Sequence, residues 1–425
     1  MGKAARWCAG ALGVVLTLSG CSGGGTGAGG VGSGGKGGKV ELSYAAWDNN
    51  QKKVLEQLGR EFTGTHPNVT VKVQLTPWTE YFNKLKTSVT GGSAPDVFWM
   101  NGPYFRLYAS NGVIRPLDKE VAEDKVDLSV YPKALIDLYT YEGELYGLPK
   151  DMDTIGVWYN KALFDARGVD HPAPDWTWSD FNRTAAELTD PGKGVYGVAA
   201  QLTSFQEYQY NTIAQAGGYV ISPDGKKSGY DQPETIKGLE FWTDLIEKKH
   251  SPDLQTMTDT SPLQLFEAGK LAMYWGGSWN AGEFSANEYT KDKVDVAPLP
   301  RGEKRATVIH GVANVVSATT EHPREAWEFV EFLGSERAAL AIGRSGPLPA
   351  RDGTRQAWVK DHPRFALTTF LDAVDYAVPF PVSENTAAWN EAELTHLTQA
   401  WTGERTVGEA SAELARAMND LLARE

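Results

Sequence analysis

The sequence has very little cysteine: Cys8 and Cys21 are the only two among 425 residues, and both lie near the N-terminus. The chain beyond position 21 therefore has no thiol for a disulfide or for a thiolate metal site. The seven histidines are scattered, without the i, i+4 spacing of a helical zinc site. We expect no metal and no other cofactor, and the fold must be stabilised by its core.

Positive charge and long apolar runs are also scarce. The formal net charge is −13, from 41 Lys and Arg against 54 Asp and Glu. A nucleic-acid partner needs a basic face that neutralises phosphates, so we expect no such partner. After residue 21 no stretch of eighteen consecutive apolar residues occurs, and we expect no membrane-spanning segment there.

The first 21 residues have the pattern of an export signal. Lys3 and Arg6 supply positive charge, Ala9–Leu18 is apolar but too short to span a bilayer, and Leu18-Ser19-Gly20-Cys21 follows. These four residues resemble the lipobox of bacterial lipoproteins. The resemblance implies that Cys21 carries lipid and anchors the protein to the outer face of the bacterial plasma membrane. A plain secretion signal is the alternative.

The rest of the chain divides into a linker and a large folded part. Residues 22–39 are mostly glycine and cannot bury enough surface to fold, so they are predicted to form a flexible tether. Residues 40–425 exceed what one hydrophobic core usually serves, which favours two lobes.

Hydrophobic periodicity predicts an α/β first lobe. Apolar residues alternate with polar ones in 40–46 and 69–75, and a buried strand begins near 97–99. Between them, helical spacing occurs in 54–62 and 79–89. The order strand, helix, strand, helix, strand is typical of a sheet covered by helices.

A second α/β lobe is predicted from residue 155 onward. An apolar strand covers 155–159, and beyond residues 312–317 the chain is predicted to be largely helical. Helices are predicted at 179–188, 206–216, 233–250, 326–333, 389–401 and 407–422.

Evidence for catalysis is weak. Ser278 lies in Gly-Gly-Ser-Trp-Asn, which lacks the second glycine of a nucleophile elbow. Asp151 and Asp153 are a possible carboxylate pair, but nothing in the sequence gives their geometry or pKa. We therefore do not expect an enzyme.

Tryptophan occurs next to short polar residues in loops that follow predicted strands. Examples are Trp47-Asp48-Asn49, Trp99-Met100-Asn101, Asp151-Met152-Asp153 and Trp275–Asn280. A sugar ring packs its C–H face on an indole, while Asp and Asn side chains hydrogen-bond its hydroxyls. The pattern favours a carbohydrate site; the alternative for each tryptophan is core packing.

Several ordered segments carry a family resemblance. They are 141–149, 153–161, 266–273, 277–279, 296–300, 325–333, Trp389 and 403–418. Together they resemble the extracellular solute-binding proteins that feed sugar ABC importers, the maltose-binding type. That resemblance implies a two-lobed, type II periplasmic-binding-protein-like α/β fold with the ligand cleft between the lobes.

The resemblance also implies how the chain is divided between the lobes. The first lobe would contain 40–149 and 308–355, and the second 150–307 and 356–425. The chain would cross between them near 147–153, 296–310 and 356–361, and the crossings would act as hinges.

The resemblance transfers specific roles to residues of this chain. Trp279 and Trp389 match aromatic residues that stack on the sugar, Asp153 matches an acid that holds hydroxyls, and Trp99 matches another cleft aromatic. Further positions expected to line the cleft are Trp47, Asp48, Asn49, Asn101, Asp151, Gly277, His310 and Gly311. For Asp48 and Asp151 the alternative is turn capping, and for Arg344, near the end of a helix, we favour a structural role.

Some positions depart from the family pattern. Pro103 stands where a charged contact is expected, Glu393 replaces a basic residue, and Glu207 stands where the family has an aromatic contact. Maltose itself is therefore not the expected ligand.

The sequence thus predicts a lipid-anchored carbohydrate receptor, acting as a monomer, that delivers its ligand to the permease subunits of an ABC importer. A receptor for a non-sugar solute and a secreted glycoside hydrolase are the alternatives.

Overall fold

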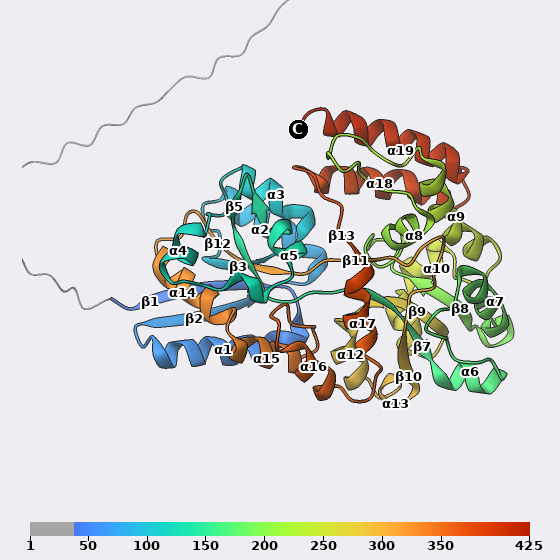
Figure 1. The fold of residues 1–425 in the computed structure, drawn as a ribbon, viewed down its shortest axis with the longest axis horizontal. Helices are drawn as coiled ribbons and strands as arrows, with labels where there is room; N and C mark the ends of the chain where they lie inside the picture. The colour runs from blue at the N-terminus through green and yellow to red at the C-terminus, as the bar shows by residue number, and fades with distance from the viewer. Residues whose placement is uncertain (1–37) are drawn as a thin grey trace, which may run out of the picture. The chain divides into compact units, whose positions relative to one another are not determined.

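The computed structural model describes residues 38–425 (Figure 1). The predicted signal peptide, with Cys21, lies outside the described residues, as does the predicted tether up to residue 37. The strands are β1 (Val40–Ala46), β2 (Val69–Leu75), β3 (Val97–Met100), β4 (Thr140–Tyr141), β5 (Glu144–Leu145), β6 (Gly147–Pro149), β7 (Ile155–Asn160), β8 (Tyr196–Ala200), β9 (Leu271–Gly277), β10 (Val294–Pro298), β11 (Thr307–Ile309), β12 (Ala313–Val316) and β13 (Ala377–Pro379).

Helices connect and cover these strands. The α-helices are α1 (Lys52–Thr65), α2 (Trp78–Thr90), α3 (Gly102–Ser110), α4 (Asp118–Glu123), α5 (Lys133–Leu138), α6 (Lys161–Arg167), α7 (Trp178–Leu188), α8 (Gln209–Ala216), α9 (Pro233–Glu247), α10 (Leu254–Asp259), α11 (Pro262–Glu267), α12 (Asn280–Ala286), α13 (Thr290–Lys293), α14 (Pro323–Leu333), α15 (Glu336–Arg344), α16 (Arg355–Asp361), α17 (Thr368–Asp372), α18 (Thr386–Trp401) and α19 (Val407–Leu422). Short 3-10 helices are η1 (Asn49–Gln51), η2 (Leu128–Val130), η3 (Pro191–Lys193) and η4 (Ala373–Tyr376).

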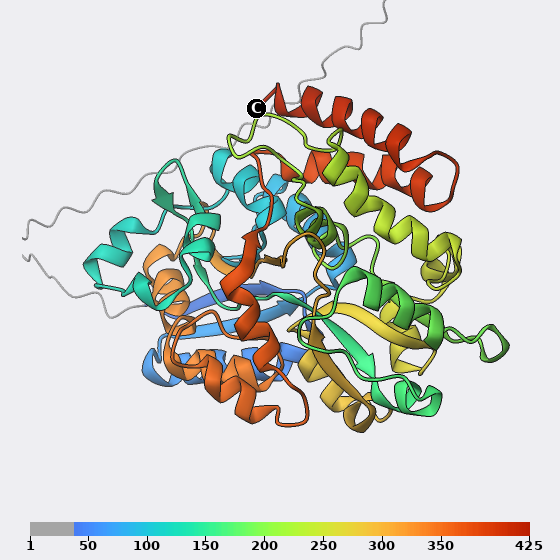
Figure 2. The same cartoon turned by 45° about the vertical axis from the view of Figure 1, so that its right-hand side comes forward.

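The first lobe is built around a five-stranded sheet with the order β2-β1-β3-β12-β6. Strands β2, β1 and β3 are parallel, whereas β12 runs antiparallel to both of its neighbours. Strand β12 comes from residues 313–316, so a late segment completes a sheet that begins at residue 40. Helices α1 and α15 lie on one side of this sheet and α2 and α3 on the other (Figures 1 and 2).

The sequence pattern explains these elements. In β1, Leu42, Tyr44 and Ala46 are buried at alternate positions, as the period of two requires. In α1, Leu58 and Phe62 are buried on one face at helical spacing.

The second lobe is built around a four-stranded sheet with the order β10-β7-β9-β8. Strand β7 is antiparallel to both β10 and β9 and is buried on both faces. Trp158 of β7 and Trp275 of β9 are fully buried, so these two indoles belong to the core. Helices α6 to α13 surround this sheet (Figure 1).

Connecting segments join the two sheets. Residues 150–154 lead from β6 to β7, and residues 299–312 lead from β10 to β12. Within the second connection, β11 pairs in parallel with β13, which forms a two-stranded ribbon between the sheets (Figure 2). Near the C-terminus, α18 packs on α19 and contacts α3 of the first lobe.

Most predicted elements are confirmed, and the differences have local causes. The helix predicted from residue 206 begins at Gln209, because residues 203–208 form turns. The helix predicted to reach residue 250 ends at Glu247, and Lys249 adopts a positive φ of 58°. Over residues 38–425, no helix is both long enough and apolar enough to cross a bilayer.

Candidate functional site

A pocket of about 300 Å³ has walls from both lobes. Helices α2 and α3 form one wall, and the loop 203–206, the residue after β13 and helix α18 form the other. Its lining residues are Trp78, Thr79, Phe82, Asn83, Asn101, Pro103, Tyr104, Thr203, Ser204, Phe205, Gln206, His310, Phe380, Ala387, Asn390, Glu391 and Leu394. We call it the interlobe pocket.

Aromatic rings form one wall of the interlobe pocket. Phe82 and Tyr104 stack with centroids 3.7 Å apart and planes at 8°, and Trp78 meets Phe82 edge to face at 5.7 Å. Trp78 is 51% exposed, which is unusual for so large an apolar side chain. The wall therefore offers apolar ring surface to a ligand.

Beside this wall, His310 and Asp153 lie where two connecting segments meet. Their backbones form an antiparallel bridge, with Asp153 N donating to His310 O at 2.9 Å and the reverse bond at 3.1 Å. The imidazole Nε2 accepts a hydrogen bond from Gly102 N at 3.0 Å, so Nδ1 carries the proton, and Nδ1 lies 3.8 Å from Asp153 Oδ2. Gln206 Nε2 donates to the other carboxylate oxygen of Asp153. Asp153 is thus held directly behind two lining residues.

Glu207 lies next to Gln206 but is fully enclosed. Tyr274 donates a hydrogen bond of 3.2 Å to its carboxyl group. Burial, with a smaller contribution from the charge of Asp153, raises the pKa of Glu207 to about 8. Glu207, at a position where the sequence resemblance implies an aromatic contact, is thus a buried acid that does not line the pocket.

Glu393 occupies a similar environment under helix α18. Tyr210 and Tyr230 donate hydrogen bonds to its carboxyl group, and Asn390 Nδ2 does so at 2.6 Å. Burial raises the pKa of Glu393 to about 8. Because Asn390 lines the interlobe pocket, Glu393 fixes the orientation of a pocket residue.

Two of the predicted cleft tryptophans, the cleft aromatic Trp99 and the stacking residue Trp389, have no free ring face in this structure. Trp99 is 1% exposed, its Nε1 donates to Tyr44 Oη at 2.6 Å, and Lys150 Nζ lies 4.1 Å from its ring centroid. Trp389 is 0% exposed, and its Nε1 donates to Ser383 Oγ at 2.8 Å. Stacking on a sugar needs an exposed ring, which the structure gives to neither.

The other two predicted tryptophans are partly exposed. Trp47 meets Trp78 edge to face at 5.3 Å and so packs against the aromatic wall, but it does not line the pocket itself. Trp279 follows β9, and its ring lies against Gly277, where no side chain would fit. Ser278 Oγ donates to Met152 O at 3.4 Å, which places this turn beside the Asp151–Asp153 connection.

The remaining predicted polar residues have structural partners. Asp48 accepts hydrogen bonds from Asn50 N at 2.8 Å and Gln51 Nε2 at 2.7 Å, and so caps η1, where Asn49 is the first residue. Asp151 forms an ion pair with Lys150 and accepts from Val312 N at 2.7 Å.

The surroundings of Asp151 and Arg344 support a structural role for each residue. Burial raises the pKa of Asp151 despite the neighbouring ammonium group of Lys150. Gly311 lies against the carbonyl oxygen of Asp151, where a Cβ has no room. Arg344 pairs with Asp361 at 3.4 Å, in line with the structural role predicted for it.

Asn101 combines a predicted role with an unusual environment. It lines the interlobe pocket and is 4% exposed, yet its Oδ1 has no hydrogen-bond partner. A buried acceptor without a partner is costly, so a ligand donor would stabilise this position.

Several aromatic residues that line the interlobe pocket were not predicted from the sequence. Trp78 and Phe82 are spaced i, i+4 in α2, a pattern that also describes a core stripe. Tyr104, Phe205 and Phe380 come from three separate segments, and only the fold brings them together. One sequence feature could have indicated this site: Trp78 is the first residue of a helix, and a side chain at that position commonly keeps one face exposed.

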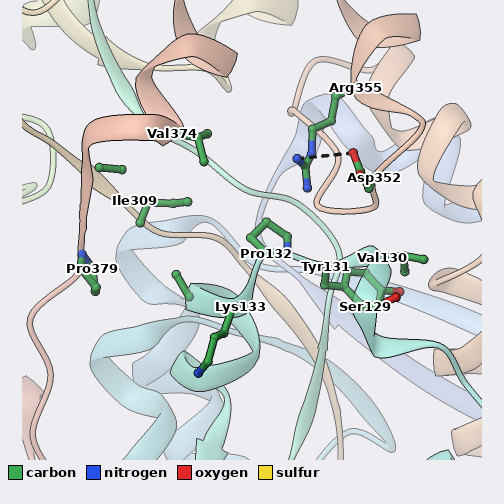
Figure 3. A pocket seen from close by; sticks show the side chains of 12 residues that line it. Ser129, Val130, Tyr131, Pro132, Lys133, Ile309, Asp352, Arg355, Val374 and Pro379 are labelled. Atoms are coloured by element: carbon green, nitrogen blue, oxygen red, sulfur yellow. Dashed lines mark ion pairs between the residues drawn. The ribbon is translucent and has the colours of Figure 1, made fainter.

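A second pocket of about 380 Å³ lies on the other side of the β11–β13 ribbon (Figure 3). Ile309 and Pro379 line it, whereas the next residues in sequence, His310 and Phe380, line the interlobe pocket. Successive residues of an extended chain point to opposite sides, so the ribbon separates the two pockets. Figure 3 shows Arg355 and Asp352, 3.6 Å apart, at its edge. We call it the hinge pocket.

No metal site is evident in the part of the chain that the structure describes. Among residues 38–425, no three His, Cys, Asp or Glu side chains are placed to hold an ion.

Known proteins with similar sequences are solute-binding proteins. A maltotriose-binding protein of Pyrococcus abyssi is 27% identical over 306 residues, which are 70% of this chain and 62% of that protein. The aligned part is thus less than two thirds of that relative's length. The maltodextrin-binding protein MdxE of Bacillus subtilis is 26% identical over 370 residues, 84% of each chain.

Solved structures agree in fold. An ABC substrate-binding protein of Listeria monocytogenes, in complex with cycloalternan, superposes with a TM-score of 0.85 at 27% identity, covering 91% of this chain and 99% of that one. The GacH receptor of Streptomyces glaucescens has a TM-score of 0.81 at 25% identity, with 91% and 99% coverage. These neighbours confirm the predicted two-lobed α/β periplasmic-binding-protein-like fold.

The match to a family extends over most of the folded part. It covers residues 44–340, which include the second sheet, all of the first sheet except the start of β1, the first two connections and the aromatic wall of α2 and α3. The chain therefore belongs to the family of bacterial extracellular solute-binding proteins, as its sequence resemblance predicted.

Proposed function

We propose that the protein is a carbohydrate receptor that binds its ligand in the interlobe pocket. The observation that carries the proposal is the pocket lining: stacked and exposed aromatic rings on one wall, and the side-chain amides of Asn101, Gln206 and Asn390 around it. Sugars present C–H faces to rings and hydroxyls to amides, so this lining suits a carbohydrate.

The relatives support this ligand class. Their names give maltotriose and maltodextrin as ligands, and the structural neighbours were determined with cycloalternan and with acarbose. Because family members serve different ligands, the identity of the sugar here has to be measured.

A thermal-shift screen of mono- and oligosaccharides, followed by calorimetry, tests the proposal. A ligand at a hundredfold excess over its Kd stabilises the folded state by about 2.7 kcal/mol, which raises Tm measurably. Amino acids, peptides and polyamines in the same screen represent a non-sugar receptor. A Tm increase with these solutes alone would overturn the carbohydrate proposal, and turnover of a reporter glycoside would indicate a hydrolase.

We further propose that the receptor delivers its ligand to the permease subunits of an ABC importer and acts as a monomer. One chain supplies both walls of the pocket, so binding requires no second copy. The predicted lobe boundaries, 40–149 with 308–355 and 150–307 with 356–425, make the three connections the hinges for closure around the ligand.

Membrane attachment through Cys21 completes the proposal. The lipobox-like Leu18-Ser19-Gly20-Cys21 supports it, together with a family of extracellular proteins. One acyl chain gives only marginal membrane binding, so stable anchoring needs more than one. The wild type should fractionate with membranes and carry lipid by mass spectrometry, whereas Cys21→Ala should stay unprocessed or enter the medium. Unlipidated wild type in the medium would contradict anchoring.

A further inference from the structure

The charges around the interlobe pocket have one dominant sign. Its lining contains no Lys and no Arg, and Glu391 is the one carboxylate among the residues that line it. Glu391 is exposed on α18 and makes no ion pair within residues 38–425. Glu391 and Tyr104 line the same pocket, and burial, with a smaller contribution from the charge of Glu391, raises the pKa of Tyr104.

The layer behind the lining adds further negative charge. Asp153 is held by Gln206 and His310, both of which line the pocket. His310 accepts a hydrogen bond from the backbone N–H of Gly102 through Nε2. The nearby Lys150 is fully buried and pairs with Asp151, so its charge is already balanced.

The pocket lining has a hydrogen-bond acceptor that lacks a donor. Asn101 Oδ1 is buried in the pocket lining without a donor. The carboxylate oxygens of Glu391 are acceptors as well, and Asp153, which already accepts from Gln206, adds negative charge behind the lining. A ligand group that donates several hydrogen bonds and carries positive charge would satisfy Asn101 and Glu391 and would complement the charge of Asp153.

Resting on the function proposed above, we propose that the interlobe pocket is specific for a sugar that carries a protonated amine. An alkylammonium group has three donors and no acceptor, and it matches carboxylate and amide oxygens. The aromatic wall serves the rest of such a sugar, and it also attracts a cation through the ring faces. A neutral sugar would use the same wall but would leave Glu391 without a counter-charge.

The test compares sugars that differ at a single substituent. Three β-1,4-linked disaccharides form one set: the glucosamine dimer, its N,N′-diacetyl derivative and cellobiose, which carry ammonium, acetamide and hydroxyl groups at C2. Glucosamine with glucose, galactosamine with galactose, and mannosamine with mannose form three more. Calorimetry at pH 6.5, where the amines are protonated, gives Kd for each. We expect the amine to bind at least tenfold more tightly than its partners in the set that fits the pocket.

The outcomes separate this inference from the proposed function. If the neutral sugars bind as tightly as the amine in every set that shows binding, the amine specificity is wrong. The proposed carbohydrate receptor would still stand. Absence of binding by every sugar, in these sets and in the wider screen, would overturn both.

Substitutions of Glu391 and Asp153 test whether these carboxylates cause the preference for the amine. The ratio of neutral to amine Kd should fall at least threefold in Glu391→Gln, because one unpaired charge is lost while the shape is kept. Glu404→Gln, on the exposed loop after α18, is the matched control and should keep the wild-type ratio. An unchanged ratio in both Glu391→Gln and Asp153→Asn would show that these carboxylates do not recognise the amine.

Discussion

The imidazole Nε2 of His310 accepts a hydrogen bond of 3.0 Å from the backbone N–H of Gly102. This bond joins the segment that connects the lobes to the first residue of α3 in the first lobe. Next to it in sequence, Asn101 lines the interlobe pocket. The orientation of a lining residue therefore depends on a side chain from the connection.

Replacing His310 should weaken both folding and binding. In His310→Ala the buried N–H of Gly102 loses its acceptor, which costs about 1 to 3 kcal/mol. Chemical denaturation and calorimetry with the cognate sugar should both report a loss. His322→Ala, at the start of α14 and outside the pocket lining, is the control and should leave affinity unchanged. Wild-type affinity in His310→Ala would show that α3 is positioned without this bond.

The different exposure of Trp78 and Trp389 predicts that replacing the first weakens binding, whereas replacing the second weakens the fold. Trp78 is 51% exposed and lines the pocket, so Trp78→Ala should reduce sugar affinity by at least about 1 kcal/mol with little change in Tm. Trp389 is 0% exposed, so Trp389→Ala should destabilise the fold by about 3 to 5 kcal/mol. Calorimetry and denaturation of both variants test this contrast. The reverse result would restore Trp389 as a stacking residue.

The sequence predicted the elements better than the site. The alternation of apolar and polar residues in 40–46 and the helical spacing of apolar residues in 407–422 are patterns among neighbouring residues. The first correctly predicted strand β1 and the second helix α19. The interlobe pocket joins α2, the loop 203–206 and α18, which only the tertiary fold brings together. Local sequence also cannot tell the exposed indole of Trp78 from the buried one of Trp389, because both lie in the first turns of helices.

The two aspartates at the first connection should respond differently to amide substitution. Asp153→Asn keeps the shape but removes the charge that holds Gln206 behind the pocket, and should reduce affinity by about 1 kcal/mol. Asp151→Asn leaves the buried ammonium group of Lys150 without its counter-charge, and should destabilise the fold by about 3 to 5 kcal/mol. Less than a threefold change in Kd for Asp153→Asn would argue that Asp153 only supports the connection.

Two buried acids predict how stability depends on pH. Burial raises the pKa of Glu207 and Glu393 to about 8 from an ordinary value of 4.5, so both hold a proton in the folded state that the unfolded chain releases. Their contribution to stability is fully present below about pH 4.5 and is lost as pH rises through about 8. Each pKa unit corresponds to about 1.4 kcal/mol, so unfolding free energy should fall between pH 5 and 8 by at least about 1 kcal/mol.

Glu393→Gln tests the origin of this slope. Glutamine resembles the neutral acid in shape and still accepts hydrogen bonds from Tyr210 and Tyr230, but it does not titrate. Denaturation at pH 5, 6.5 and 8 should show a shallower pH dependence than in the wild type. The matched control is Glu409→Gln, since Glu409 lies at the exposed start of α19 and its pKa is lowered by hydrogen bonds from Thr406. An equal slope in Glu393→Gln and wild type would place the titration elsewhere.

Closure of the lobes should accompany binding. A sugar held only by the aromatic wall of α2 and α3 gains contacts with Gln206 and Asn390 when the lobes approach, so it favours the closed state. Because the β11–β13 ribbon separates the two pockets, rotation about it that narrows the interlobe pocket must widen the hinge pocket. A shift from mostly open to mostly closed needs about 5.5 kcal/mol of differential affinity, which several hydrogen bonds and a ring contact can supply. Small-angle scattering of a form without residues 1–21 should show a smaller radius of gyration at saturating sugar; identical profiles with and without it would identify a rigid binder.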